Sequence, residues 1–507
     1  MRPQRGLAES LPRHNRWTWL TLGATLAAMR TVCHAFFAAA LCGCRAPQPT
    51  AVPPAPTAPP AAGAPTAPTT TTPVADPALT QRCTQLAEKA LTDNHAIEIL
   101  KGLLTAAPKR LSGSPGYDAA VRWGLATMRE IGLDNVHTEP CMVPCWVRGE
   151  ERAEVVGAGA MPLRITALGG SVATPEGGIE AEIVEVRSFE QLRALGEAAR
   201  GKIVFFNRPM PRALRRTGQA YGEAVPQRTN GAVEAGKQGA VGAIVRSVTT
   251  AIDGHPHTGA MNYDEAVTKV PAAAIATEDA EALSALMKQG PVRVHLVLGC
   301  ETRPDVAAAN VIGELRGSVH PDEIVLIGGH LDAWDLGRGA HDDGAGIAHV
   351  LEALRLLETC GIRGKRTIRA VLFANEENGL RGALAYAAAH ADELPKHTAA
   401  IETDGGGFSP QGFSCSLRDA EAEAVHALFL PLQDLGAGVF ASGAGAGGAD
   451  IGPLAKAAVP CFGLWVDGQR YFDYHHSEVD DLPMVNEREL ALGAAVIAYA
   501  ASVLADR

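Results

Sequence analysis

The apolar positions of this chain follow two different spacings. In CTQLAEKALTDNHAIEILKGLLTAA (83–107) and DAAVRWGLATMREIG (118–132), apolar residues recur every three or four positions, which predicts helices. A strand-like DNVHTEP (134–140) follows. From about 150 to 300, short apolar runs such as GKIVFF and VGAIVRSV are separated by Gly, Pro and Asp. This second pattern predicts a small β-rich region with a helix or two.

After residue 305, apolar strands alternate with amphipathic helices. The expected strands are ANVIGEL, EIVLIGG, RTIRAVLFA, TAAIETD and PCFGLWV, and helical patterns lie between most of them. Such alternation is typical of an α/β fold with a mostly parallel central sheet and helices on both faces. In these sheets, ligands bind where the strands end.

The first 80 residues have a composition unlike the rest. MRTVCHAFFAAALCGC (29–44) resembles a lipoprotein signal with Cys44 as the lipidated residue, although an ordinary export signal or a membrane anchor fits as well. Translation could begin at Met1 or at Met29. Residues 45–80 are rich in Pro, Ala and Thr, which predicts a disordered tether. Every reading places the protein outside the cytosol, lipid-anchored in the cell envelope or secreted.

Composition excludes other classes. The 507 residues are 47% hydrophobic and 20% charged, so the chain can bury a large core and hold more than one domain. The net charge is −11, with no long basic block, which argues against nucleic acid as a partner. Seven of the ten cysteines lie beyond the leader. None has a CxxC spacing, at least one has no intramolecular partner, and the pairing of the others stays open.

Groups that can bind metals recur at the expected strand ends. His330 follows one strand, Glu376 and Glu377 the next, Asp404 a third, and His476 lies beyond a fourth. Imidazole and carboxylate without thiolate suit zinc or a similar divalent ion. Glu377, Asp404, the nearby Asp342 and a bridging hydroxide would together offset the charge of two divalent ions. Charge balance therefore favours a pair of metals over one.

Six stretches carry a resemblance to a known family. They are RLSGSPG, GGHLDAWDLGRGAHDDGAG, FANEENGLRG, ETDGGGF, GGADIGPL and YHHSEVDD. From about residue 81 to the end, the chain resembles the di-zinc exopeptidases of the carboxypeptidase Q type, which are related to secreted bacterial aminopeptidases. The resemblance implies a peptidase domain formed by residues 81–150 and 301–507. Residues 151–300 resemble the protease-associated domain that is often inserted into this fold.

The resemblance also implies a role for each site residue. It makes His330, Glu377, Asp404 and His476 terminal ligands of two zinc ions per chain, Asp342 the bridging carboxylate and Glu376 the general base and acid. His476 is preferred to His475 because the family's histidine lies four residues before an Asp, here Asp480. A cis peptide between Asp342 and Asp343 is implied as well. Asp332, two residues after His330, is expected to hold that imidazole in the correct tautomer.

Other residues are harder to interpret. Asp450 either caps the following helix or orients substrate. His255 and His257, in DGHPHTG, have no nearby acidic or thiol partner and are predicted to lie in a surface loop. Three arginines near the motif loops cannot be placed from the sequence: Arg338, Arg381 and Arg470.

The leading function is a zinc-dependent exopeptidase that hydrolyses terminal bonds of short peptides or dipeptides. A glutaminyl-cyclase-like transferase is an alternative within the fold, and a non-catalytic binding protein is one from another class. The preference for the amino or the carboxyl end, the side-chain specificity and the oligomeric state, possibly a homodimer, stay open.

Overall fold

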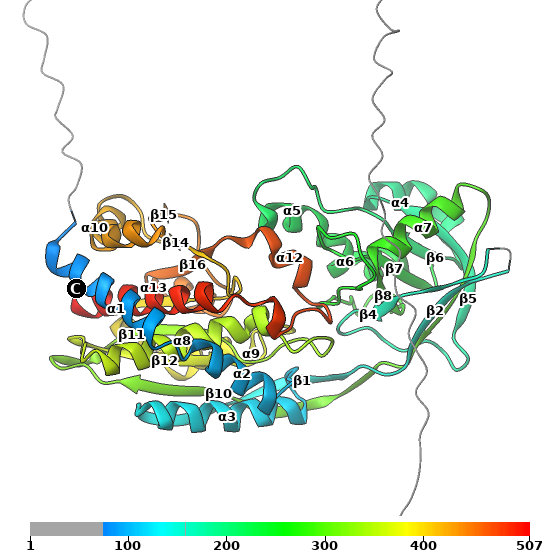
Figure 1. The fold of residues 1–507 in the computed structure, drawn as a ribbon. Coiled ribbons are helices and arrows are strands. Elements are labelled where there is room, and N and C mark those ends of the chain that lie inside the picture. Colours follow the sequence, from blue (N-terminus) through cyan, green and yellow to red (C-terminus); the bar gives the residue numbers. More distant parts are fainter. Residues whose placement is uncertain (1–74, 158) are drawn as a thin grey trace, which may run out of the picture. The chain divides into compact units, whose positions relative to one another are not determined.

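The computed structural model describes residues 75–507 except residue 158 (Figure 1). The predicted signal, the lipidation at Cys44 and most of the tether lie outside the described residues. Helix α1 (Pro77–Thr92) begins inside the segment predicted as tether. Its start is set by Asp76, whose carboxylate accepts a hydrogen bond from the backbone N–H of Ala78, and by a proline in the first turn.

The next elements follow the apolar spacing. Helices α2 (Ala96–Ala106) and α3 (Pro115–Ile131) lie where the sequence predicts them, and Ser114 caps α3 by accepting from the N–H of Tyr117. Strand β1 (Asp134–Val147) extends beyond the predicted segment. It pairs antiparallel with β10 (Glu301–Leu315). Residues 151–298 are therefore inserted between two strands that lie side by side.

The first sheet has eight strands in the order β1-β10-β12-β11-β13-β16-β14-β15. Its other strands are β11 (His320–His330), β12 (Arg366–Phe373), β13 (His397–Glu402), β14 (Pro410–Cys415), β15 (Val439–Ser442) and β16 (Cys461–Val466). The centre, β12-β11-β13-β16, is parallel, whereas β1–β10, β10–β12 and β14–β16 are antiparallel. The β14–β15 pair at one margin is parallel as well, so the sheet is mixed and most of its strand pairs have the predicted parallel order.

Helices cover both faces of this sheet. The side chains of β11 point alternately to the two faces and pack in two separate cores. Val325 and Ile327 pack with α8 (Ala345–Thr359) and α13 (Glu487–Asp506), whereas Ile324 and Leu326 pack with α9 (Arg381–Ala389) and α11 (Gly452–Lys456). Helices α10 (Asp419–Phe429) and α12 (Tyr471–Tyr474) complete this part. Within the described residues, α13 alone is long and apolar enough to span a membrane, but 89% of that stretch is buried, as in a core helix.

The second sheet comes wholly from residues 151–298 and has the order β3-β2-β9-β5-β6-β7-β8-β4. Its strands are β2 (Glu151–Val156), β3 (Met161–Leu163), β4 (Ile165–Ala167), β5 (Ile179–Val186), β6 (Ile203–Phe206), β7 (Gly242–Arg246), β8 (Ala272–Ile275) and β9 (Arg293–Leu298). The helices of this segment are α4 (Phe189–Leu195), α5 (Thr217–Ala224), α6 (Pro226–Lys237) and α7 (Thr277–Met287). The sequence predicted one or two. Segments such as TGQAYGEA and PQRTNGAVEAGK have few large apolar residues, so their helical spacing is weak.

One side chain of the loop after β11 is buried in the core of the second sheet. The indole of Trp334 is 3% exposed and packs edge-on against Trp146, with ring centroids 6.3 Å apart. A Cβ on Gly169 would overlap this indole, so the glycine is what permits the close approach. The loop that carries the predicted metal ligands is thereby fixed to the 151–298 segment.

The fold makes a prediction about acid stability. His397, at the start of β13, is 3% exposed, and burial lowers its pKa to about 4. Its neutral ring contacts the Tyr386 hydroxyl (Nε2–Oη 2.8 Å) and the Glu393 carbonyl (Nδ1–O 3.2 Å). Because the folded pKa lies below the unfolded value, stability present above about pH 6.5 is lost as the pH falls, by about 3 kcal/mol at pH 4.

Urea unfolding of chelator-treated protein at about pH 7 and pH 4 measures this loss. The His397→Gln variant should lose less stability over that interval than the wild type. Equal losses in the two proteins would show that His397 does not contribute to the acid dependence.

Candidate metal centre

Neighbouring parallel strands bring the first group of predicted ligands together. His330 ends β11, and Asp404 follows β13, the strand beside it. The Nε2 atom of His330 lies 3.2 Å from Oδ1 of Asp342 and 3.5 Å from Oδ1 of Asp404. These three side chains can offer one atom each to a single metal ion.

A second group lies on the other side of Asp342. The Nε2 atom of His476 is 3.3 Å from Oδ2 of Asp342 and 3.1 Å from Oε2 of Glu377, which follows β12. The two oxygens of Asp342 thus face two different imidazoles. This is the arrangement that a carboxylate shared between two metal ions requires.

The donor atoms fit a cation chemically. Nε2 of His330, Oδ2 of Asp342 and Oδ1 of Asp404 are buried and have no hydrogen-bond partner among the described residues. Burial lowers the pKa of His330, but its contacts with Asp342 and Asp404 outweigh burial and raise the pKa well above its usual value. Buried carboxylates that favour a positive neighbour, with imidazole nitrogens beside them, suit zinc.

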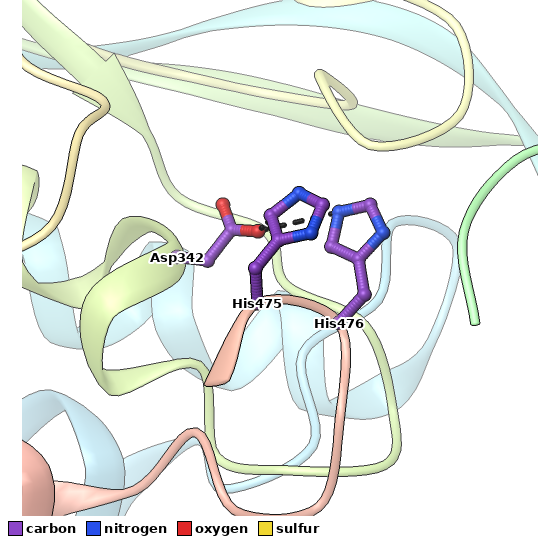
Figure 2. Close-up of side chains that lie close together, drawn as sticks. All are labelled: Asp342, His475 and His476. Carbon is purple, nitrogen blue, oxygen red and sulfur yellow. Dashed lines mark ion pairs between the residues drawn. The ribbon is translucent and has the colours of Figure 1, made fainter. Parts of the chain in front are cut away.

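His475 is a neighbour of the same carboxylate (Figure 2). Its Nε2 lies 3.6 Å from Oδ2 of Asp342, and its ring stacks on that of His476 with centroids 3.5 Å apart. Only His476 is also in contact with Glu377. Its φ of 62° lies in the left-handed region, which is uncommon outside glycine and frequent at functional sites. The contacts therefore favour His476 over His475 as the ligand.

Comparisons with known proteins identify the family. The family model described as Peptidase family M28 matches residues 310–501. Carboxypeptidase Q of Mus musculus is 38% identical over 415 residues, which cover 82% of this chain and 86% of that protein. The human carboxypeptidase Q is 37% identical over 425 residues, with 83% and 87% covered. The chain belongs to peptidase family M28. It is a metallo-exopeptidase.

Solved structures extend the likeness to the fold. A peptidase M28 precursor from Shewanella amazonensis has a TM-score of 0.82 and 39% identity, over 85% of this chain and 97% of that one. A zinc aminopeptidase from Bacillus subtilis has a TM-score of 0.59 over 80% and 93% of the two chains. At 20% identity, the second likeness shows the fold alone.

In this M28 peptidase, backbone groups orient the first imidazole. Nδ1 of His330 lies 3.2 Å from the backbone carbonyl oxygen of Asp332 and 3.7 Å from its carboxylate. The carboxylate instead accepts a hydrogen bond from the backbone N–H of Glu376, at 3.1 Å. The nearer acceptor for His330 is thus the Asp332 carbonyl and not the carboxylate, which holds the backbone at Glu376.

The second imidazole is held by the 151–298 segment. Nδ1 of His476 lies 3.3 Å from the carbonyl oxygen of Thr258. The next residue back, His257, is 2% exposed, and its Nδ1 lies 2.6 Å from the carbonyl oxygen of His475. The prediction of a surface loop is wrong for His257. These partners are more than 200 residues apart in sequence, so no local pattern could reveal the contact.

Two further residues hold the loop between His330 and Asp342, and the sequence analysis gave neither this role. Arg110, which is fully buried, donates to the carbonyl oxygens of Leu331 and Gly339, both at 2.8 Å. The carboxylate of Asp480 accepts from the backbone N–H of His341 at 2.7 Å and of Asp342 at 3.0 Å. The peptide between Asp342 and Asp343 is cis, as the family resemblance implied.

Glu376 and Asp450 lie beside the ligand set. Burial, reinforced by Asp404 and Glu377, raises the pKa of Glu376 well above its usual value, as suits a group that exchanges protons. Asp450 is fully buried, and neither of its carboxylate oxygens has a partner among the described residues. Helix α11 begins after Ile451 and has no side-chain cap, so the capping alternative for Asp450 is wrong.

The contacts of Asp480 predict its effect on metal affinity. In Asp480→Asn, one acceptor oxygen becomes a donor facing a backbone N–H, which loosens the turn at Asp342. We expect the zinc affinity to fall about 10- to 100-fold. Competition titration with a chromophoric chelator measures it.

The neighbouring Asp481→Asn provides a matched control, because Asp481 pairs with Arg338 and its side chain is 32% exposed. Its zinc affinity should stay near the wild-type value. Equal affinities in the two variants would contradict the role given to Asp480.

Proposed function

We propose that this M28 peptidase is a zinc-dependent exopeptidase of short peptides that holds two zinc ions. His330 and Asp404 would hold one ion, and Glu377 and His476 would hold the other. Asp342 would hold both. The observation that carries the proposal is the position of Asp342, whose oxygens lie 3.2 Å and 3.3 Å from the two imidazoles.

The proposed chemistry assigns the proton transfers to Glu376. Zinc, when bound, polarises the scissile carbonyl and lowers the pKa of water. Glu376 takes the proton of the attacking water and returns it to the leaving amine. The hydrogen bond from its N–H to Asp332 fixes the backbone from which this side chain reaches the substrate. Asp450 is fully buried without a hydrogen-bond partner among the described residues, and the alternative that it orients substrate stays a prediction.

The two alternative functions have less support. A glutaminyl-cyclase-like transferase would not need a carboxylate placed between two ligand groups, and a non-catalytic binding protein would not need a complete ligand set with Glu376 beside it. Here His330, Asp342, Glu377, Asp404 and His476 converge and Glu376 lies next to them. The carboxypeptidase Q relatives further favour hydrolysis.

We also propose a cellular location for the enzyme and a domain type for residues 151–298. The leader with Cys44 supports an extracytoplasmic peptidase, lipid-anchored or secreted. The 151–298 segment would be a protease-associated domain, with its own sheet and a loop against the metal centre.

Metal removal tests the proposed function. Protein dialysed against a chelator should lose hydrolysis of dipeptides, and zinc should restore it, because the metal is needed to activate water. Magnesium, which prefers octahedral oxygen ligands, is the control and should not restore activity. Undiminished turnover in metal-free protein, or no turnover of any peptide by the zinc-loaded protein, would contradict the proposal.

Adjacent glutamates should give different defects. Glu376→Gln should keep its zinc but lose about 100- to 10,000-fold in kcat, because the proton acceptor is gone. Glu377→Gln should bind less zinc, because a ligand is weakened. Zinc content by elemental analysis and kcat on a dipeptide separate the two. Zinc loss in Glu376→Gln, or full zinc content in Glu377→Gln, would reverse the assigned roles.

A further inference from the structure

One imidazole at the metal centre has no task in the proposed function. His475 is 7% exposed, so a small part of it stays accessible. Its Nε2 lies 3.6 Å from Oδ2 of Asp342, the same oxygen that faces His476 at 3.3 Å. That separation is too long for a hydrogen bond, and the ring makes no other hydrogen bond within the described residues. The ring nitrogens of His475 are thus left for a partner from outside the chain.

The stacking of the two histidines excludes His475 as a second ligand of the ion at His476. Their rings lie face to face beside the Asp342 carboxylate, with centroids 3.5 Å apart and planes within 18° of each other (Figure 2). An imidazole nitrogen binds zinc in the plane of its ring, at about 2.1 Å. Two stacked and nearly parallel planes do not meet at one ion so close to both rings. His476, which is also in contact with Glu377, takes the ligand position.

The ring of His475 is fixed by its neighbours. Tyr221 and Phe472 pack edge-on against it, each with ring centroids 5.3 Å away, and the Tyr471 ring lies at 5.1 Å. The backbone is held as well: the N–H of His475 donates to the Tyr471 carbonyl at 2.9 Å, and its carbonyl accepts from Nδ1 of His257 at 2.6 Å. The fold therefore sets the position of Nε2.

The two stacked rings present different chemistry to Asp342. A neutral imidazole carries one proton, on either nitrogen, and the carboxylate beside Nε2 of His475 favours the proton there. In His476, Nδ1 faces the Thr258 carbonyl at 3.3 Å and lies 3.4 Å from Nη1 of Arg228. Its proton on Nδ1 leaves Nε2 free to bind a metal. His475 thus offers an N–H donor where His476 offers a lone pair.

We propose that the Nε2–H of His475 donates a hydrogen bond to the oxygen of the scissile carbonyl, which makes His475 a further catalytic residue. This rests on the proposed exopeptidase function. As water attacks the carbonyl carbon, that oxygen gains negative charge, so a fixed N–H donor stabilises the transition state more than the bound substrate. The donor lies beside Asp342, at the centre of the ligand set, where the scissile carbonyl must be held.

Two other donors near the centre are less suitable. Nε1 of Trp334 has no partner among the described residues, but its indole is packed in the core of the second sheet. Both ring nitrogens of His341 are already used: Nδ1 accepts from the N–H of Gly407 at 3.1 Å, and Nε2 lies 3.2 Å from the Met484 carbonyl oxygen. The nitrogens of His475 have no such partners.

The test separates stabilisation of the transition state from packing. His475→Phe keeps an aromatic ring in the stack and removes the N–H donor. On a dipeptide, the zinc-loaded variant should lose about 100- to 1000-fold in kcat, the usual loss for one oxyanion donor, at a nearly unchanged KM. His475→Gln, whose amide N–H can reach the same position, should retain part of the wild-type kcat.

His426→Phe provides a matched control, because this imidazole is also stacked, on Phe440 with centroids 4.9 Å apart. It lies on α10, which carries none of the predicted ligands, and kcat should stay at the wild-type value.

Two further measurements accompany the kinetics. Elemental analysis should find the wild-type zinc content in His475→Phe. Calorimetry should show that this variant binds a phosphinic analogue of the dipeptide, whose tetrahedral centre imitates the transition state, more weakly by about the same factor as kcat falls.

Loss of zinc in His475→Phe would show that the residue supports the metal centre and would overturn the donor role. A wild-type kcat in this variant, or a lower kcat with unchanged affinity for the phosphinic analogue, would overturn it as well. No turnover of any peptide by the zinc-loaded wild type would instead contradict the proposed function, and the catalytic role of His475 with it.

Discussion

The structure depends on one electrostatic constraint: several carboxylates converge in a buried site, where they contact the imidazoles of His330, His475 and His476. Asp342 lies at the centre, with one oxygen toward His330 and the other toward His476. Glu377 and Asp404 add further negative charge at the two ends. Such a cluster is tolerable only with compensating positive charge, which divalent cations would supply. The peptidase chemistry follows from this requirement.

The rest of the fold holds these groups in register. Parallel strands β11, β12 and β13 end at the same edge of the sheet and deliver a ligand each. The loop bearing Asp342 is fixed by buried polar groups rather than by regular structure, since Arg110 binds its carbonyls and Asp480 its N–H groups. The 151–298 segment contributes the carbonyl of Thr258 behind His476. The metal centre is therefore shared by two parts of the chain that have separate sheets.

The sequence revealed what depends on local pattern. The ends of the predicted strands and the spacing of the motifs indicated that the five predicted ligands and Glu376 lie close together. The reason is that the carboxyl ends of parallel strands lie at the same edge of a sheet. The antiparallel pairs of the first sheet and the weakly amphipathic α5 and α6 were not predicted, since register and tertiary burial decide them. Arg228, Thr258 and His257 were missed as neighbours of the site for the same reason: their contacts with the His475–His476 pair join segments more than 200 residues apart.

Anomalous diffraction at the zinc absorption edge from a crystal of the zinc-loaded protein tests the central claim most directly. The account predicts two peaks, each about 2 Å from a different oxygen of Asp342, one beside His330 and the other beside His476. A single peak, or two peaks neither of which contacts Asp342, would contradict it.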